Sequence, residues 1–217
     1  MIVSVSSLKG GVGKSTVSIN LAVCFAHQGY TVCIADSDTN KSCLRWSELR
    51  PDNLPQVTVV GYDTADQLAK NVPKLDNIYD IVLIDGTPSL SETTSKLILL
   101  ADILVMPVRA GALDLWSLEL FIETLKKAEQ FKGQAIPSYF LLNQFDKRLT
   151  ISKETKEVLK DVEQIKLFEN SLSLYIAYSE SIIKGKGAAE FSDKKAQNEI
   201  INLANEIQGV LANAAKT

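Results

Sequence analysis

The chain has 217 residues, of which 46% are hydrophobic and 23% are charged, and its formal net charge is −3. This length suits a single domain over residues 1–217 with a sizeable core, and the composition excludes a disordered or fibrous chain. No apolar run approaches the roughly 18 residues that a membrane-spanning helix needs, and no signal peptide precedes the first apolar segment, so we expect a cytoplasmic protein.

The first predicted elements are a buried strand over residues 2–5, a turn with three glycines, and a helix that begins near Lys14. This arrangement makes a phosphate cradle, because successive N–H groups and the positive end of the helix dipole point at the same place. In such a loop Lys14 would reach the β- and γ-phosphates, and the Ser15 hydroxyl would ligate Mg2+.

The loop departs from the usual pattern G-x-x-x-x-G-K-[ST], because Leu8 stands at the first glycine position and Lys9 precedes the glycines. The segment Lys9-Gly-Gly-Val-Gly-Lys14-Ser-Thr resembles the deviant Walker A motif of the ParA/MinD family of ATPases. The resemblance implies catalytic roles for Lys9 and Lys14, with Lys9 reaching across a dimer interface to the nucleotide of the other subunit. It also implies an ATP site built from Lys9, Gly10, Gly11, Val12, Gly13, Lys14, Ser15 and Thr16.

The second predicted strand, residues 31–35, leads into Asp36 and Asp38, and carboxylates at this end of a parallel strand lie where open α/β sheets bind ligands. Asp36-Ser-Asp38-Thr-Asn is similar to the D-x-D-P-Q segment of the family. The resemblance implies that Asp38 activates the attacking water and that Asp36 belongs to the Mg2+ shell. The alternative is structural: Asp36 ends the strand, and Asp38 caps the next helix.

A helix over residues 41–50, a strand over 57–61 and a short polar helix over 64–75 are expected next. Trp46 is interpreted as a packing residue. The three cysteines, Cys24, Cys33 and Cys43, fit neither a zinc pattern nor a disulfide framework, and we interpret them as core-filling thiols rather than redox groups.

The apolar run 79–85 predicts a strand that ends on Asp85, an arrangement typical of a Walker B aspartate that holds Mg2+ through water. Residues 86–89 resemble the D-x-P-P-S segment of the family, which lies beside the γ-phosphate and is well placed to act as a switch.

A helix over 91–100 and a strand over 103–107 lead to a long helix over 113–131, which in the family lies at or near the dimer face. The alternative for Trp116 and Phe121 on this helix is ordinary packing. A strand over 138–142 ends on Asn143, which in many relatives reads the adenine edge, although asparagine is also common at strand ends.

A charged helix over 151–165, a strand over 172–177 and a closing helix over 194–213 complete the chain. Residues 178–190 resemble the small plasmid-partition ParA proteins, except that Tyr175 stands where some relatives carry arginine. Strands that alternate with helices predict a doubly wound, mainly parallel sheet with helices on both faces.

The basic residues are uneven along the chain: residues 121–195 hold 13 Lys and Arg against 11 Asp and Glu, whereas residues 1–120 hold 9 against 13. Any DNA site on this acidic chain must therefore be a local patch. The candidate phosphate contacts are Lys147, Arg148, Lys184, Lys186, Lys194 and Lys195.

The resemblance implies a ParA-type partition ATPase with ATP and Mg2+ as cofactors. We expect it to form a homodimer when ATP is bound and to bind DNA without sequence preference at the nucleoid. We also expect a ParB-like centromere-binding or adaptor protein to stimulate its ATP hydrolysis. Two alternatives remain open: a MinD-like regulator that cycles on a membrane, and a metabolic P-loop enzyme. The C-terminal helix lacks a basic, bulky apolar face, so no membrane binding is expected.

Overall fold

The computed structural model describes residues 1–7, 9–86, 92–111 and 115–214. Its centre is a sheet with the strand order β3-β2-β4-β1-β5-β6-β7, in which β8 pairs with β6. Every strand pairing of this sheet is parallel. The strands are β1 Ile2–Val5, β2 Val32–Asp36, β3 Thr58–Gly61, β4 Ile81–Asp85, β5 Ile103–Arg109, β6 Ser138–Phe145, β7 Lys166–Leu167 and β8 Leu172–Ser173.

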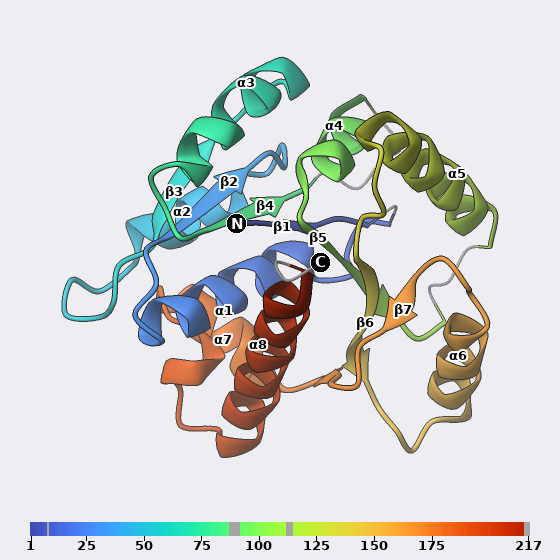
Figure 1. Ribbon diagram of the computed structural model, residues 1–217. Coiled ribbons are helices and arrows are strands. Elements are labelled where there is room, and N and C mark those ends of the chain that lie inside the picture. Colours follow the sequence, from blue (N-terminus) through green and yellow to red (C-terminus); the bar gives the residue numbers. More distant parts are fainter. Residues whose placement is uncertain (8, 87–91, 112–114, 215–217) are drawn as a thin grey trace.

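Helices cover both faces of the sheet, with α3, α4 and α5 on one side and α1, α7 and α8 on the other (Figure 1). Alternate residues of β4 therefore enter different cores: Ile81 and Leu83 pack with α1 and α8, and Val82 and Ile84 pack with α3. The helices are α1 Lys14–His27, α2 Ser42–Glu48, α3 Ala65–Asp76, α4 Glu92–Leu100, α5 Leu115–Lys132, α6 Thr150–Lys160, α7 Ile176–Ile183 and α8 Lys194–Ala214, with a short 3-10 turn η1 at Ala188–Glu190. The predicted doubly wound α/β fold is confirmed.

Two of the predicted elements are wrong in the second half of the chain. The predicted strand 172–177 ends at Ser173, and α7 begins at Ile176. The alternation of Leu172, Leu174 and Ile176 resembles a strand, but Leu174 and Ile176 are 68% and 73% exposed, so only Leu172 of these three is buried.

The predicted helix 151–165 ends early, at Lys160. Residues 161–165 instead form turns and a bend in which Ile165 is buried, and the two-residue strand β7 follows them. A strand this short leaves no periodic pattern in the sequence.

The packing predictions have mixed outcomes. The three cysteines are buried and free, and Trp46 is buried, as predicted. On α5, Phe121 is fully buried, but Trp116 is 82% exposed, so core packing of Trp116 is wrong. Leu8, the candidate switch residues 87–89, the start of the predicted helix at 113–114 and the chain end at 215–217 lie outside the described residues.

Candidate nucleotide-binding site

A glycine-rich loop joins β1 to α1 at the carboxyl edge of the sheet. Gly11 and Gly13 have positive φ angles of 73° and 88°, which side-chain-bearing residues rarely adopt. Gly13 is also the N-cap residue of α1, so the loop runs directly into the positive end of that helix. A loop of this geometry at a helix N-terminus is suited to present backbone N–H groups to an anion, and the anion binding that the sequence predicts stays a prediction.

The loop lines a cavity of about 370 Å³ that also receives residues from the end of β2 and from α7. The lining residues are Gly10, Gly11, Gly13, Lys14, Ser15, Thr16, Ile19, Asp38, Asn40, Ser42 and Ile182. Six of the eight predicted loop residues therefore line one cavity together with Asp38, whereas Lys9 and Val12 are not among its lining residues. Ile182 was not predicted, because nothing in the local sequence indicates that α7 returns to this loop.

Lys14 is buried in the wall of this cavity. Burial lowers the pKa of its ammonium group, and the carboxylates of Asp85 and Asp38 oppose this effect. An amine held in this way lacks part of its hydration, so an anionic ligand such as a phosphate would be a strong partner for it.

Asp85 lies beneath the loop, fully buried at the end of β4. The Ser15 hydroxyl donates to its Oδ2 at 2.6 Å, and the Ser18 hydroxyl donates to its Oδ1 at 3.0 Å. The Cys43 thiol donates to Oδ2 at 3.3 Å. Burial raises the pKa of Asp85 to about 6, and the neighbouring Asp36 carboxylate adds to this effect against the three donors.

Ser18 and Cys43 were not predicted as partners of Asp85. Ser18 is one helical turn beyond Lys14 and so shares its face, which is a local signal. The Cys43 contact bridges 42 positions of the chain, and no sequence pattern predicts it.

Asp36 is paired with Asp85 in the register of β2 and β4. Its carboxylate accepts N–H groups from Asp38 at 3.1 Å, from Cys43 at 3.0 Å and from Leu44 at 3.1 Å. Asp36 therefore caps α2, a role that the structural alternative gave to Asp38. The Asp38 carboxylate accepts the Asn40 N–H at 2.9 Å and lines the cavity.

The donor set fits Mg2+, which prefers oxygen ligands and keeps several water molecules in its shell. The Ser15 hydroxyl and the Asp85 carboxylate are hard oxygen donors next to the loop, and the second buried carboxylate, Asp36, adds negative charge. Within the described residues, no group of three or more His, Cys, Asp or Glu side chains could hold a metal ion, so these ligands would act with phosphate and water oxygens.

Asn143 lies at the carboxyl edge of β6, under the loop. Its amide Nδ2 donates to the Val12 carbonyl at 2.7 Å, and a Cβ on Gly13 would lie 2.3 Å from the same nitrogen. The structure thus shows Asn143 supporting the loop backbone, and its contact with adenine stays a prediction.

Lys9 and Gly10 lie at the outer rim of the loop. The Lys9 N–H donates to the Ser7 hydroxyl at 3.4 Å. Gly10 is exposed, and a Cβ placed on it would meet no atom of the described residues within 4 Å. The described residues therefore leave the space at Gly10 open, and the predicted role of Lys9 in a second subunit stays a prediction.

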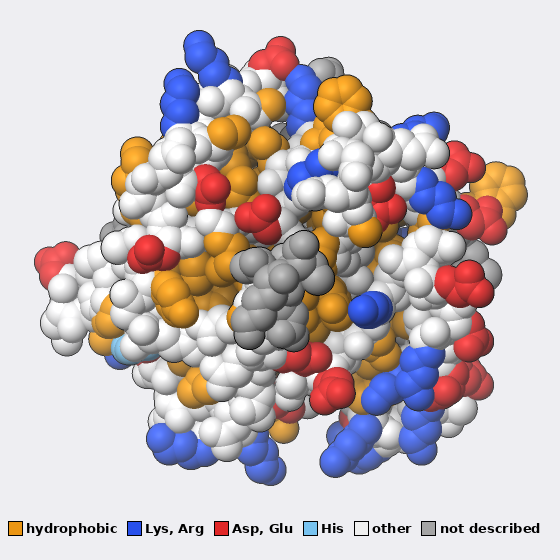
Figure 2. All heavy atoms as spheres, viewed as in Figure 1, with side chains coloured by type: hydrophobic (Ala, Val, Ile, Leu, Met, Phe, Trp, Pro, Cys, Tyr) orange, Lys and Arg blue, Asp and Glu red, His pale blue; other side chains and the backbone are white. Residues whose placement is uncertain are grey.

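The predicted basic residues adjoin three different elements: Lys147 and Arg148 precede α6, Lys184 and Lys186 follow α7, and Lys194 and Lys195 begin α8. Figure 2 shows Lys and Arg side chains over α6 and, separately, below α7 and α8. Arg148 forms an exposed ion pair with Asp146 at 2.7 Å, and the Lys184 ammonium lies 4.8 Å from the centre of the Phe191 ring.

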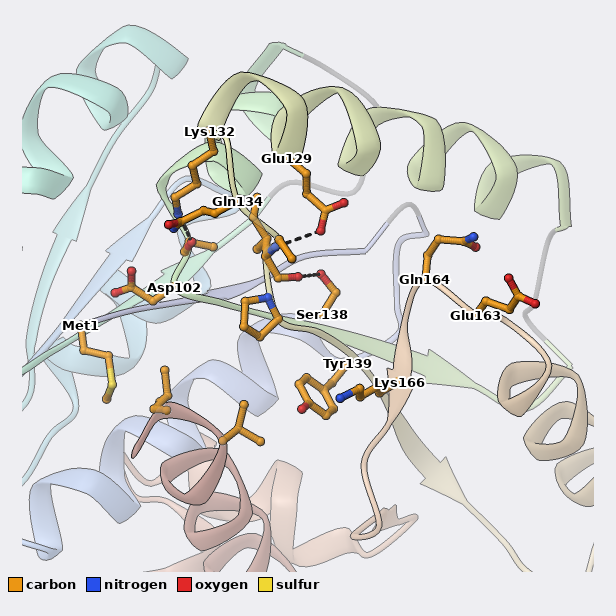
Figure 3. Close-up of a pocket in the computed structure, with 16 residues that line it drawn as sticks. Met1, Asp102, Glu129, Lys132, Gln134, Ser138, Tyr139, Glu163, Gln164 and Lys166 are labelled. Atoms are coloured by element: carbon orange, nitrogen blue, oxygen red, sulfur yellow. Dashed lines mark hydrogen bonds between the residues drawn. The ribbon is translucent and has the colours of Figure 1, made fainter. Parts of the chain in front are cut away.

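A larger cavity lies elsewhere, at the amino ends of β5 and β6, and measures about 980 Å³ (Figure 3). Its charged groups hold the backbone of its own wall: Glu129 accepts the Ile136 N–H, and Lys132 donates to the Ala101 carbonyl. None of the predicted site residues lines it. We therefore assign the chemistry to the smaller cavity at the glycine-rich loop.

A parallel, doubly wound sheet with a phosphate-type loop between its first strand and helix defines a P-loop nucleotide-binding protein. Residues 3–188 match the model of the CobQ/CobB/MinD/ParA nucleotide binding domain. The chain therefore belongs to this family. No helix in the described parts of the chain is long and apolar enough to cross a membrane.

Relatives and solved structures extend the comparison. The chain is 23% identical over 207 residues to the maintenance of carboxysome distribution protein A of Halothiobacillus neapolitanus, with 94% of each chain covered. It is 33% identical over 115 residues to protein ParA of Rhizobium radiobacter, which covers 52% of this chain and 50% of that protein. The septum site-determining protein MinD of Pyrococcus horikoshii OT3, complexed with Mg-ADP, has a TM-score of 0.75 at 22% identity, with 100% of this chain and 99% of that chain covered.

Proposed function

We propose that the chain is a ParA-type partition ATPase that uses ATP and Mg2+. Its ATP-bound form is a homodimer that binds DNA without sequence preference. A ParB-like centromere-binding or adaptor protein stimulates hydrolysis, which releases the dimer from the nucleoid. Plasmid, chromosome or protein cargo attached to that partner is thereby segregated or positioned.

One observation carries this proposal: Lys14, Ser15 and Asp38 line one cavity on the glycine-rich loop, and Asp85 accepts the Ser15 hydroxyl below it. ATP hydrolysis requires positioning and neutralisation of charge, with little covalent chemistry. Backbone N–H groups of the loop bind the phosphates, Lys14 neutralises the β- and γ-phosphate oxygens, and Asp38 orients the attacking water. Ser15 would ligate Mg2+, Asp85 would hold it through water and Asp36 would belong to its shell, and the ion would supply a further positive charge at those oxygens.

The likeness to a carboxysome distribution protein over 94% of the chain, and to protein ParA over about half of it, supports a role in positioning. Lys9 and Gly10 support the dimer, because they lie at the rim of the loop and the space in front of Gly10 is open. A second subunit can approach the nucleotide from that side.

The test is DNA retention by the full chain with Mg-ATP, with Mg-ADP and without nucleotide, together with flotation on anionic liposomes. We expect DNA binding in ATP alone and no liposome binding. Lys14→Ala should lose ATP binding, because the phosphate charge loses its main partner. DNA binding that ignores the nucleotide would contradict the proposal, and ATP-dependent liposome binding without DNA binding would favour the membrane-cycling alternative.

A further inference from the structure

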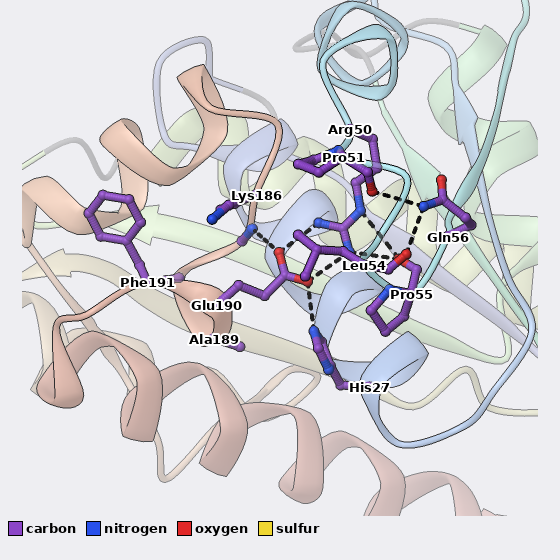
Figure 4. Close-up of polar contacts among 12 residues, drawn as sticks. His27, Arg50, Pro51, Leu54, Pro55, Gln56, Lys186, Ala189, Glu190 and Phe191 are labelled. Atoms are coloured by element: carbon purple, nitrogen blue, oxygen red, sulfur yellow. Dashed lines mark hydrogen bonds and ion pairs between the residues drawn. The ribbon is translucent and has the colours of Figure 1, made fainter.

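A buried ion pair lies outside the nucleotide cavity and joins distant parts of the chain (Figure 4). The guanidinium of Arg50 contacts both oxygens of Glu190, at 2.6 Å from Nη1 and 2.7 Å from Nη2. The two side chains are only 2% and 4% exposed. Burying two charges costs desolvation free energy unless every donor and acceptor of the pair has a hydrogen-bond partner.

The remaining donors and acceptors of the pair are also engaged. Arg50 donates from Nη2 to the Pro55 carbonyl at 2.7 Å and from Nη1 to the Gly185 carbonyl at 3.2 Å. Glu190 accepts the Gly187 N–H at 3.1 Å and contacts His27 Nε2 at 2.6 Å. Burial alone would raise the pKa of Glu190, but the hydrogen bonds from Arg50, Gly187 and His27 outweigh it and leave that pKa lowered.

The segment 185–190 packs closely against the end of α2 and is hydrogen-bonded to it. A Cβ on Gly185 would lie 2.0 Å from the Leu49 carbonyl oxygen, so only glycine permits this approach of two backbones. The Trp46 indole donates to the Lys186 carbonyl at 3.1 Å. Arg50, the residue after Leu49, then completes the attachment through Glu190.

The same segment is also hydrogen-bonded to α1, the helix that begins with Lys14, Ser15 and Thr16. The Ala188 N–H donates to the Asn20 side chain at 2.6 Å, and that side chain donates to the Thr16 carbonyl at 2.8 Å. A Cβ on Gly187 would lie 2.9 Å from Val23, so the fit to α1 is close.

Helix α2 begins shortly after Asp38, and its first N–H groups hold Asp36. The segment 185–190 thus ties the helix next to Asp38 to the helix of the P-loop. We propose that Arg50 and Glu190 are positioning residues: they hold α2 against α1 and so fix Asp38 at the distance from the P-loop that hydrolysis requires. This inference rests on the ATPase activity proposed above.

The test compares Glu190→Gln, which keeps the shape and removes the charge, with Arg50→Lys, which keeps the charge and loses the two-pronged contact. For both variants we expect an ATP dissociation constant within about twofold of wild type and a kcat lowered about tenfold or more, because a small displacement of a catalytic group is costly. The control is Glu157→Gln, which breaks the exposed pair with Lys160 and should change neither quantity.

Two further measurements report how firmly α2 is packed and do not depend on ATP turnover. In a Trp116→Phe background the remaining Trp46 is buried, and we expect acrylamide to quench its fluorescence more strongly in Glu190→Gln. The buried Cys43 thiol on α2 should be alkylated faster in that variant, whereas Cys33 in β2 serves as an internal reference and should not change.

Trp46→Phe keeps the ion pair but removes the bond to Lys186, and it should give a smaller effect in the same direction. A fall of kcat together with ATP affinity, with Cys33 and Cys43 exposed equally, would overturn the inference, because general loosening of the fold gives that result. Unchanged kcat with unchanged Trp46 and Cys43 would also overturn it. A wild-type chain without ATP turnover would instead refute the proposed function, while the tryptophan and thiol readouts still test the attachment of α2.

Discussion

At the scale of single residues, Asp38 and Asp85 differ in what surrounds them. Asp85 is enclosed by Ser15, Ser18 and Cys43, whereas Asp38 lines the cavity in which phosphates would lie. An acceptor that faces the cavity can orient water, and an enclosed carboxylate can anchor a metal shell. The two aspartates are therefore expected to affect different quantities when they are changed.

Asp38→Ala should bind ATP normally and hydrolyse it about 10²- to 10⁴-fold more slowly, because the attacking water loses the group that orients it. Single-turnover hydrolysis and nucleotide titration of the same sample measure the two quantities. Turnover at the wild-type rate would remove Asp38 from the mechanism.

Asp85→Asn tests the cost of burying the Asp85 carboxylate. Burial raises the pKa of Asp85 from its ordinary value of 3.8 to about 6 in the folded chain, so folding takes up a proton between these pH values. The free energy of unfolding contributed by Asp85 therefore falls as pH rises through this window, by up to about 3 kcal/mol.

In EDTA at pH 7, Asp85→Asn should thus unfold at a higher denaturant concentration than wild type, although it binds Mg2+ poorly. Its advantage should shrink as the pH is lowered toward 4, where wild-type Asp85 is also neutral. Urea titrations of both proteins across this range provide the measurement. A variant that is less stable than wild type by a constant amount at every pH would show that the hydrogen bonds of Asp85 outweigh its desolvation.

Much of the candidate site could be predicted because it is local in sequence. The loop from Lys9 to Thr16 is continuous, and its glycines match positive φ angles at Gly11 and Gly13. The parts that were missed come from distant segments, such as Cys43 on Asp85 and Ile182 in the cavity wall. Their positions depend on how α2 and α7 pack against the sheet and the loop, and no local pattern in a single sequence predicts such packing.

At the scale of elements, the glycine-rich loop presents Gly10 outward from the junction of β1 and α1. Because a Cβ on Gly10 would have no atom of the described residues within 4 Å, a side chain there should leave the monomer intact. Any loss of function in such a variant must then come from contact with another molecule.

Gly10→Val should therefore keep its melting temperature and its ATP affinity but remain monomeric in Mg-ATP, because the valine methyls would hold two facing loops apart. Light scattering with and without nucleotide gives the oligomeric state. Gly209→Val is a useful control, since that glycine on α8 also has open space around it. An ATP-dependent dimer of normal affinity in Gly10→Val would argue against face-to-face loops.

The elements themselves were predictable where they bury apolar residues on both faces. Strands such as β4, with Ile81, Val82, Leu83 and Ile84, are continuous apolar runs, as parallel strands between two helical layers should be. The two-residue strands β7 and β8 lack such a run. The start of α7 lies inside the predicted strand 172–177 and was placed too late, because Leu174 and Ile176 are apolar without being buried.

At the scale of the whole molecule, the chain is acidic, so binding to DNA depends on where its lysines lie. Lys194 and Lys195 are the first residues of α8, and Asp193 accepts the N–H groups of Lys195 and Ala196 there. Cations at the positive end of a helix dipole are unfavourable by about 0.3–1 kcal/mol each. Two exposed lysines at this position therefore lower the stability of the fold. Binding to a polyanion such as DNA would account for their presence there.

This reasoning predicts opposite effects on stability and on binding. Lys194→Glu combined with Lys195→Glu should raise the melting temperature, because acidic residues favour the start of a helix. The same variant should bind DNA more weakly in ATP, to the same extent for every sequence, because contacts to phosphates carry no sequence information.

The salt dependence gives the number of contacts. Each phosphate contact contributes about 0.9 to the slope of log affinity against log salt, so loss of two contacts should lower that slope by about 2. The matched control is Lys126→Glu with Lys127→Glu on α5. This variant also reverses two exposed lysines, so it changes the net charge of the chain by the same amount as the α8 variant. Equal loss of DNA binding in both double variants would mean that overall charge controls binding, and unchanged binding in the α8 variant would exclude the start of α8 from the DNA-binding face.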